Sequence, residues 1–94
     1  MQDFEWDPAK DSANQEKHGI GFADAVAVFD DPDRLEVDSS RPEYGEERRK
    51  TIGRIGATVA VVISTDRQGR RRIISARRAS RDERRQYDQG TATP

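Results

Sequence analysis

The densest apolar segment of this chain is short, and it limits what the chain can fold into. The longest apolar run, residues 59–63, lies within a segment from Ala57 to Thr65. Odd-numbered positions from Ala57 to Ile63 share one face of this segment and the positions between them line the other, which predicts a β-strand. Such a run is far too short to cross a bilayer. With only 32% hydrophobic residues among 94, we expect one small domain with a thin core, stabilised by a partner.

The segments around this strand predict an α+β fold of the RelE-like kind, with N-terminal helices packed on an antiparallel sheet and a short C-terminal helix. We expect the second face of the sheet to stay open. The other strands are expected at residues 4–6, 34–38, 48–55 and 71–76. The helices are expected at residues 8–18, 21–29 and 80–90.

Local chemistry sets the expected helix ends. Asp7-Pro8 is an N-cap followed by proline at the first helical position, and Gly19 ends the helix. Ser80 and Glu83 have the spacing of a capping box that starts the last helix. We therefore predict a single domain over residues 1–88 and a disordered tail over residues 89–94.

Charge divides the chain into two halves. Residues 1–47 carry fourteen acidic and four basic side chains, whereas residues 48–94 carry four acidic and thirteen basic ones. The total of −1 hides this contrast. Fourteen of the seventeen cations are arginines, and a guanidinium offers a rigid set of donors to phosphate oxygens. The second half therefore favours nucleic-acid binding, although a composition bias with mostly solvated arginines is the alternative.

The expected last strand concentrates this arginine character. Simple alternation places Arg71, Ile73, Ser75 and Arg77 on one face, and places Arg72 with Arg78 on the other. Only one face can meet the helices. The open face would pair arginines with small or hydroxyl side chains on a shallow surface, which suits an RNA backbone.

At this point the residues resemble a known family, the BrnT-type toxins, over residues 4 to 87. The resemblance rests on an N-terminal set, a central set and a C-terminal set in this order: Trp6, Asp7, Lys10, Asn14, Lys17, His18, Gly19, Phe22, Ala25 and Phe29; Arg48, Ile52, Gly53 and Arg54; Arg72, Ile73, Ile74, Ser75, Ala76, Arg77, Ala79, Arg81, Glu83, Arg84 and Tyr87.

The resemblance implies a toxin of a bacterial type II toxin–antitoxin system, with a RelE-like fold. It implies a ribonuclease that cuts RNA and arrests translation and growth. It also implies a BrnA-like antitoxin with a ribbon-helix-helix region that neutralises the toxin. Operator DNA would then be contacted only through the antitoxin.

A metal-independent endoribonuclease needs groups that hold the pentavalent phosphate and groups that move protons. Arginine serves the first purpose only, because its pKa lies above about 12. We therefore predict that the phosphate is clamped by Arg48, Arg54, Arg77 and Arg81. Further RNA contacts are predicted for Lys17, Arg72, Arg78 and Arg84.

The predicted proton-transfer groups are His18, Glu47 and Tyr87, and each has a structural alternative. His18 has a fitting pKa, but it also suits the end of a helix beside Gly19. Glu47 adjoins Arg48, but it also belongs to a solvated acidic run. Tyr87 lies four residues after Glu83 and could instead pack its ring on the sheet. Glu83 and Lys17 are further candidates, and Glu83 has its capping-box role as the alternative.

Other functions are less well supported by the residues. The chain has no cysteine and one histidine, so we expect no metal site, no cofactor and no disulfide. We expect the protein to work in a reducing cytoplasm and to have no membrane partner. A DNA-binding regulator lacks a helix pair with a basic recognition helix. A module that binds nucleic acid or protein through its arginine face without catalysis stays open as the alternative to an enzyme.

Overall fold

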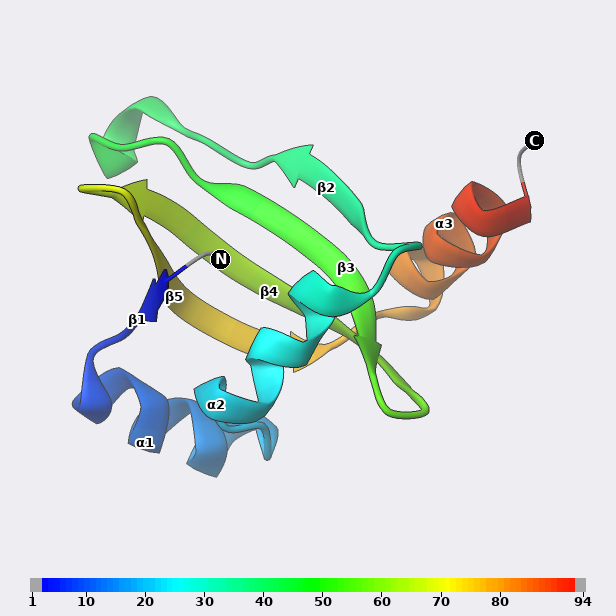
Figure 1. Cartoon of the computed structure of the whole chain (residues 1–94), viewed down its shortest axis with the longest axis horizontal. Coiled ribbons are helices and arrows are strands. Elements are labelled where there is room, and N and C mark those ends of the chain that lie inside the picture. Colours follow the sequence, from blue (N-terminus) through cyan, green and yellow to red (C-terminus); the bar gives the residue numbers. More distant parts are fainter. Residues whose placement is uncertain (1–2, 93–94) are drawn as a thin grey trace.

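The computed structural model describes residues 3–92, and the side chains of residues 3–90. A five-stranded sheet has the order β1-β5-β4-β3-β2, and helices lie at both ends of the chain (Figure 1). The strands are β1 (Asp3–Glu5), β2 (Leu35–Asp38), β3 (Arg49–Ile55), β4 (Thr58–Arg67) and β5 (Arg70–Arg78). The helices are α1 (Pro8–His18), α2 (Phe22–Ala25) and α3 (Arg81–Ala92), with 3₁₀ segments η1 (Val26–Asp30) and η2 (Pro42–Tyr44).

The sheet is mixed, so the prediction of a purely antiparallel sheet is wrong at one edge. β1 runs parallel to β5, with Asp3 opposite Arg70 and Glu5 opposite Arg72. The other strand pairs are antiparallel as expected. β1 and β5 are separated by helices and by three other strands, so their pairing is not limited to the antiparallel arrangement of a hairpin.

α1 confirms the predicted helix from Pro8 to His18. The Asp7 side chain accepts a hydrogen bond from Ala9 N at 2.9 Å, and Gly19 ends the helix in the left-handed conformation at φ 73°. Its alanines are exposed, and the buried residue is Asn14. A buried polar side chain, rather than an apolar stripe, therefore fixes α1 to the sheet.

The second expected helix is broken in two. α2 has one turn, and η1 continues it with tighter 3₁₀ winding. Phe22, Ala25 and Val28 are fully buried, whereas Val26 and Phe29 are half-buried. The change of winding brings Val28 onto β3, where a Cβ at Gly53 would lie 2.8 Å from Val28 Cγ1. Gly53 thus permits η1 to approach the sheet closely.

The sheet is covered on both faces. The helical face is the one on which Phe22, Ala25 and Val28 pack against β4 and β5. The second face is the opposite one, where Tyr87 of α3 packs with residues of β3 and β4 such as Ile52 and Val61. The expectation of an open second face is therefore wrong where α3 lies. Beyond α3, part of the second face is bordered by Tyr44 of η2 and by Arg48.

A β-bulge in β5 changes the expected face assignment. Ser75 lies opposite Ile63, but Ile73 lies opposite Ser64, so Ile74 has no partner on β4. As a result, Ile73 joins Ala76 in the helical-face core. The arginines shift with it: Arg72 shares the second face with Arg77, while Arg71 is buried on the helical face beside Phe29 and Glu36. Strict alternation predicted the reverse grouping.

α3 continues to Ala92, so residues 89–92 are helical where a disordered tail was expected; residues 93 and 94 lie outside the described part. The last turn fits against β2 because Gly90 has no side chain: a Cβ there would lie 2.8 Å from Leu35 Cδ2. None of the helices in residues 3–92 is long and apolar enough to span a membrane.

Candidate functional site

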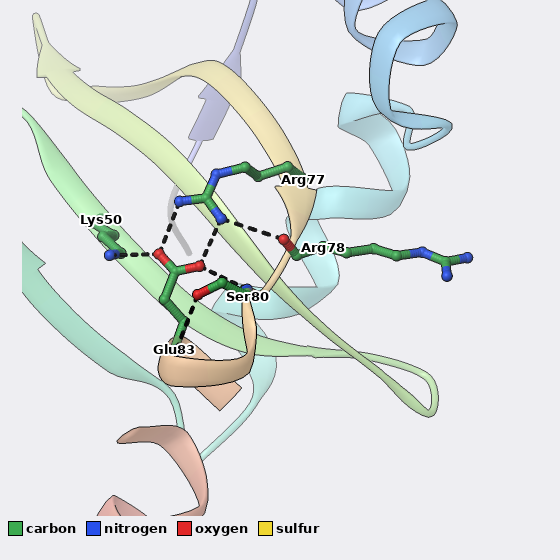
Figure 2. Close-up of polar contacts among 5 residues, drawn as sticks. All are labelled: Lys50, Arg77, Arg78, Ser80 and Glu83. Atoms are coloured by element: carbon green, nitrogen blue, oxygen red, sulfur yellow. Dashed lines mark hydrogen bonds and ion pairs between the residues drawn. The ribbon is translucent and has the colours of Figure 1, made fainter. Parts of the chain in front are cut away.

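Three charged side chains meet on the second face where β3, β5 and α3 come together (Figure 2). Arg77 of β5 donates to both oxygens of Glu83, with Nη1–Oε1 at 2.6 Å and Nη2–Oε2 at 2.8 Å. Lys50 of β3 approaches the same carboxylate, with Nζ–Oε2 at 2.6 Å. We call Lys50, Arg77 and Glu83 the cationic cluster, because it keeps one net positive charge.

The start of α3 places the carboxylate. Ser80 Oγ accepts from Glu83 N at 3.2 Å, and Glu83 Oε1 accepts from Ser80 N at 2.9 Å. This is the reciprocal pattern of a capping box, which confirms the spacing seen in the sequence. The Glu83 side chain is only 9% exposed, so its position is fixed. Lys50 reaches it from β3 and Arg77 reaches it from β5, with β4 between these two strands.

The ion pairs change the acidity of their members. The Arg77 guanidinium, together with Lys50 and the Ser80 amide, lowers the pKa of Glu83 far below its usual range, although burial opposes this. The Glu83 carboxylate in turn raises the pKa of Arg77. Glu83 is therefore ionised at any physiological pH and is a poor proton carrier. Its role in the cluster is to hold the two cations.

Both cations keep hydrogen-bonding capacity for a further anion. A guanidinium has five N–H donors and an ammonium has three. The contacts of Arg77 within the described chain are two bonds to Glu83 and one to the Arg78 carbonyl at 3.3 Å. Among the described residues, Lys50 makes one polar contact, to Glu83. Two donors on each cation are left, and the Arg77 side chain is 38% exposed. The cluster can therefore bind a phosphate oxygen without losing Glu83.

Arg48 lies two residues before Lys50 and is held by its own neighbours. Its guanidinium carbon lies 3.8 Å from the centroid of the Tyr44 ring, and Nε contacts Glu46 Oε2 at 3.2 Å. Glu47 is exposed, and its carbonyl accepts from Thr65 Oγ1 at 2.6 Å. Arg48 thus lies beside Ile63 and Ser75 of the second face, whereas Glu47 is joined to this region through its backbone carbonyl.

Tyr87 is buried on the sheet, in line with the packing alternative for this residue. It is 1% exposed, and its hydroxyl donates to Asp31 Oδ2 at 2.6 Å. Burial and the Asp31 carboxylate raise the pKa of Tyr87 to about 12. Arg54 lies above the ring, at 5.7 Å from its centroid, and its backbone N–H also donates to Asp31, at 3.0 Å. Tyr87 therefore ties α3 to the end of η1.

The other predicted phosphate or RNA contacts are dispersed. Arg72 shares the second face but is paired with Glu5 of β1 at 2.8 Å. Arg81 and Arg84 are exposed along the outer side of α3. Arg78 is exposed and points in the opposite direction from Arg77 (Figure 2). The structure thus separates the neighbours Arg77 and Arg78, of which only Arg77 belongs to the cluster.

Lys17 and His18 lie in the last turn of α1. Lys17 is exposed and His18 is half-buried. Neither makes a hydrogen bond or ion pair with the cationic cluster among the described residues. Their location at the helix end matches the structural alternative given for His18, since cations suit that end of the helix dipole.

Sequence reasoning missed Lys50 altogether and gave Glu83 only a secondary place. Alternation along β3 would have put Lys50 on the same face as Ile52 and Arg54, which was a usable pattern. Nothing local, however, indicates that Glu83 reaches across to β3 and β5. Among residues 3–92, no three His, Cys, Asp or Glu side chains are grouped as metal ligands would be.

Comparisons with known proteins identify the family. The family model described as "Ribonuclease toxin, BrnT, of type II toxin-antitoxin system" matches residues 6–83. These residues include every element from α1 to β5, as well as the start of α3 with Glu83. The search of curated proteins found no match.

Proposed function

The chain belongs to the BrnT family of ribonuclease toxins from type II toxin–antitoxin systems, and on this premise we propose that it cleaves RNA at the cationic cluster. The observation that carries the proposal is the pairing of Arg77 with Lys50 on one buried carboxylate, with donors left over on both cations. Such fixed charges stabilise a phosphorane because they need no rearrangement as the negative charge develops.

The reaction we propose is transfer of the RNA phosphate to the adjacent 2′-oxygen, without a metal ion. As the 2′-oxygen attacks phosphorus, its proton passes to a base, the bond from phosphorus to the 5′-oxygen breaks, and a 2′,3′-cyclic phosphate forms. The departing 5′-oxygen takes up a proton from water. Arg77 and Lys50 bind the non-bridging oxygens, and Arg48 binds a neighbouring phosphate. Glu47 is our candidate base, because it is an exposed carboxylate next to Arg48.

Membership of the family supports a proposal about the biological setting as well. A type II toxin has an antitoxin partner, and we propose a BrnA-like protein with a ribbon-helix-helix region, through which alone the complex contacts operator DNA. We propose that RNA cleavage in the cytoplasm inhibits translation and growth. We also assign the α+β fold to the RelE-like group, since α2 and η1 pack on one face of the sheet and the cationic cluster lies beside α3 on the other.

The decisive experiment compares three purified proteins on single-stranded RNA in the presence of EDTA: wild type, Arg77→Ala and Arg78→Ala. We expect wild type to give 2′,3′-cyclic phosphate ends. We expect Arg77→Ala to be about 100- to 1,000-fold slower. Arg78→Ala is the matched control, because it removes the same charge from the next residue on the opposite side, and it should stay within a few-fold of wild type.

Two results would contradict this proposal. Cleavage that EDTA abolishes would contradict metal independence. RNA binding without cleavage would instead support a binding module. In that case the slope of log affinity against log salt concentration should be smaller in Arg77→Ala by about one released ion.

A further inference from the structure

A hollow of about 570 Å³ lies on the second face beside the cationic cluster. Its floor comes from β4 and β5 and its wall from the segment 38–44 together with Arg48. The volume is in the range of about 300–1,000 Å³ that is typical of sites for small ligands. The cluster needs none of the wall residues for its own contacts.

The floor of the hollow is apolar because of the bulge in β5. Ile74 has no partner on β4, and it lines the hollow next to Ser75 and Ile63. All three residues are half-buried, so part of each is accessible. The Ser75 hydroxyl makes no hydrogen bond with another described residue. A flat apolar ligand with a polar edge would cover the isoleucines and find a donor and acceptor in Ser75.

The wall of the hollow adds an aromatic surface and positive charge. The Tyr44 ring lines it, and Arg48 stacks on that ring with its carbon 3.8 Å from the centroid. Aromatic rings and arginine planes are the groups on which unpaired bases stack. The charge favours a ligand that carries phosphate.

Register places the hollow one step along the strands from the cluster. Lys50 lies directly opposite Ile63, which in turn lies opposite Ser75. Arg77 follows Ser75 by two residues, roughly 7 Å at the usual rise of a strand. A nucleotide whose phosphate contacts Lys50 and Arg77 can therefore place an adjacent base over Ile63 and Ser75.

We propose that this hollow receives one unpaired nucleobase next to the phosphate bound by Lys50 and Arg77, and so sets the nucleotide preference of cleavage. The inference rests on the proposed function, because it assumes RNA at the cluster. It assigns to Tyr44, Ser75 and Ile74 a role in specificity rather than in bond breaking. It also requires single-stranded RNA, since a paired base cannot enter the hollow.

The test uses two variants that change the hollow and leave the cluster intact. Tyr44→Ala removes the aromatic wall, and Ser75→Tyr fills the floor. Tyr44→Phe is the matched control, because it keeps the ring. Circular dichroism and thermal unfolding establish that each variant folds. Cleavage ends from a random single-stranded RNA pool, read by sequencing, give the nucleotide preference beside each cut.

We expect wild type and Tyr44→Phe to share a bias at one position next to the cut. In Tyr44→Ala and Ser75→Tyr that bias should flatten, and cleavage of the preferred sequence should fall about 5- to 100-fold, the usual effect of losing one stacked base. An unchanged bias in both variants would overturn the proposal.

A binding measurement separates this inference from the proposed function. Uncleavable 2′-O-methyl strands of single and duplex form are titrated against the same proteins. If wild type binds single strands through Tyr44 but never cleaves RNA, the cleavage proposal fails and the hollow stands. If Tyr44→Ala and Ser75→Tyr bind every single strand as wild type does, the hollow is overturned. The hollow is also overturned if the two variants lose affinity for the antitoxin and keep their affinity for RNA.

Discussion

Asn14 pairs with the backbone of Ala76 as a neighbouring strand would. Its Nδ2 donates to the Ala76 carbonyl at 2.7 Å, and its Oδ1 accepts from the Ala76 N–H at 3.2 Å. A third bond joins Nδ2 to the Ile20 carbonyl at 2.9 Å. β1 pairs only with residues 70–72 of β5. The Asn14 side chain therefore supplies the hydrogen-bond partners that the backbone of Ala76 lacks at this edge, just before Arg77.

Because of this contact, we expect Asn14→Ala to lower the stability of the protein strongly. The change leaves the Ala76 donor and acceptor without partners in a buried place, and we expect the free energy of unfolding to fall by about 2–3 kcal/mol. Urea denaturation at pH 7 measures it. Ser12→Ala, on the exposed side of the same helix, should change stability by less than about 0.5 kcal/mol. Equal effects of the two changes would contradict the account.

Glu83→Gln should weaken both stability and activity. It removes the charge that holds Arg77 and Lys50, and we expect a loss of about 1–3 kcal/mol at pH 7. Asp82→Asn, at the exposed neighbouring position, is the control. RNA cleavage should fall in Glu83→Gln even where the protein is fully folded, because the two cations lose their common anchor. Retained cleavage would show that the carboxylate does not position them.

Acid should lower the stability of wild type more than that of Glu83→Gln. The pKa of Glu83 is lower in the folded protein than its ordinary value of 4.5, so its stabilising effect is complete above that pH and is lost as the pH falls below it. Urea denaturation at pH 7 and pH 3 measures the free energy of unfolding of both proteins, and the difference between these two free energies should be smaller at pH 3. A constant difference would contradict this coupling.

Tyr87→Phe should lower stability by about 1 kcal/mol, because it removes the bond to Asp31, and should leave RNA cleavage within a few-fold of wild type. The folded pKa of about 12 lies above the ordinary value of 10.0. The stabilisation is therefore complete below pH 10 and is lost between pH 10 and pH 12. Denaturation across that range, with Tyr44→Phe as control, measures it. A severe loss of cleavage at unchanged stability would give Tyr87 a chemical role.

Gly53→Ala should destabilise the protein by about 1–3 kcal/mol, because the new Cβ would lie 2.8 Å from Val28 Cγ1 and 3.1 Å from the Val28 carbonyl oxygen. The double variant with Val28→Ala should lose less stability than the two single changes added together, since Val28→Ala removes the methyl contact but not the backbone one. Thermal unfolding of the single and double variants gives the coupling. Simple additivity would contradict the close approach of η1 to β3.

The sequence by itself determined the features that depend on neighbouring residues. Asp7 and Gly19 set the limits of α1, and Ser80 and Glu83 set the start of α3. Gly56 and Gly69 stand in the turns between strands, with positive φ angles of 60° and 79°. The pattern of motif residues also indicated the family. The helix ends and the turns follow from bonds or conformations within a few residues, which are visible in the order of side chains.

The tertiary structure alone decided which charged side chains lie together. The bulge at Ile74 moved Arg72 to the face of Arg77 and buried Arg71 on the other face. The packing of α3 on the second face brought Glu83 between Lys50 and Arg77, whose positions lie 27 residues apart in the numbering. Strand register and helix docking come from the summed packing of distant residues, so the order of side chains alone did not reveal this cluster.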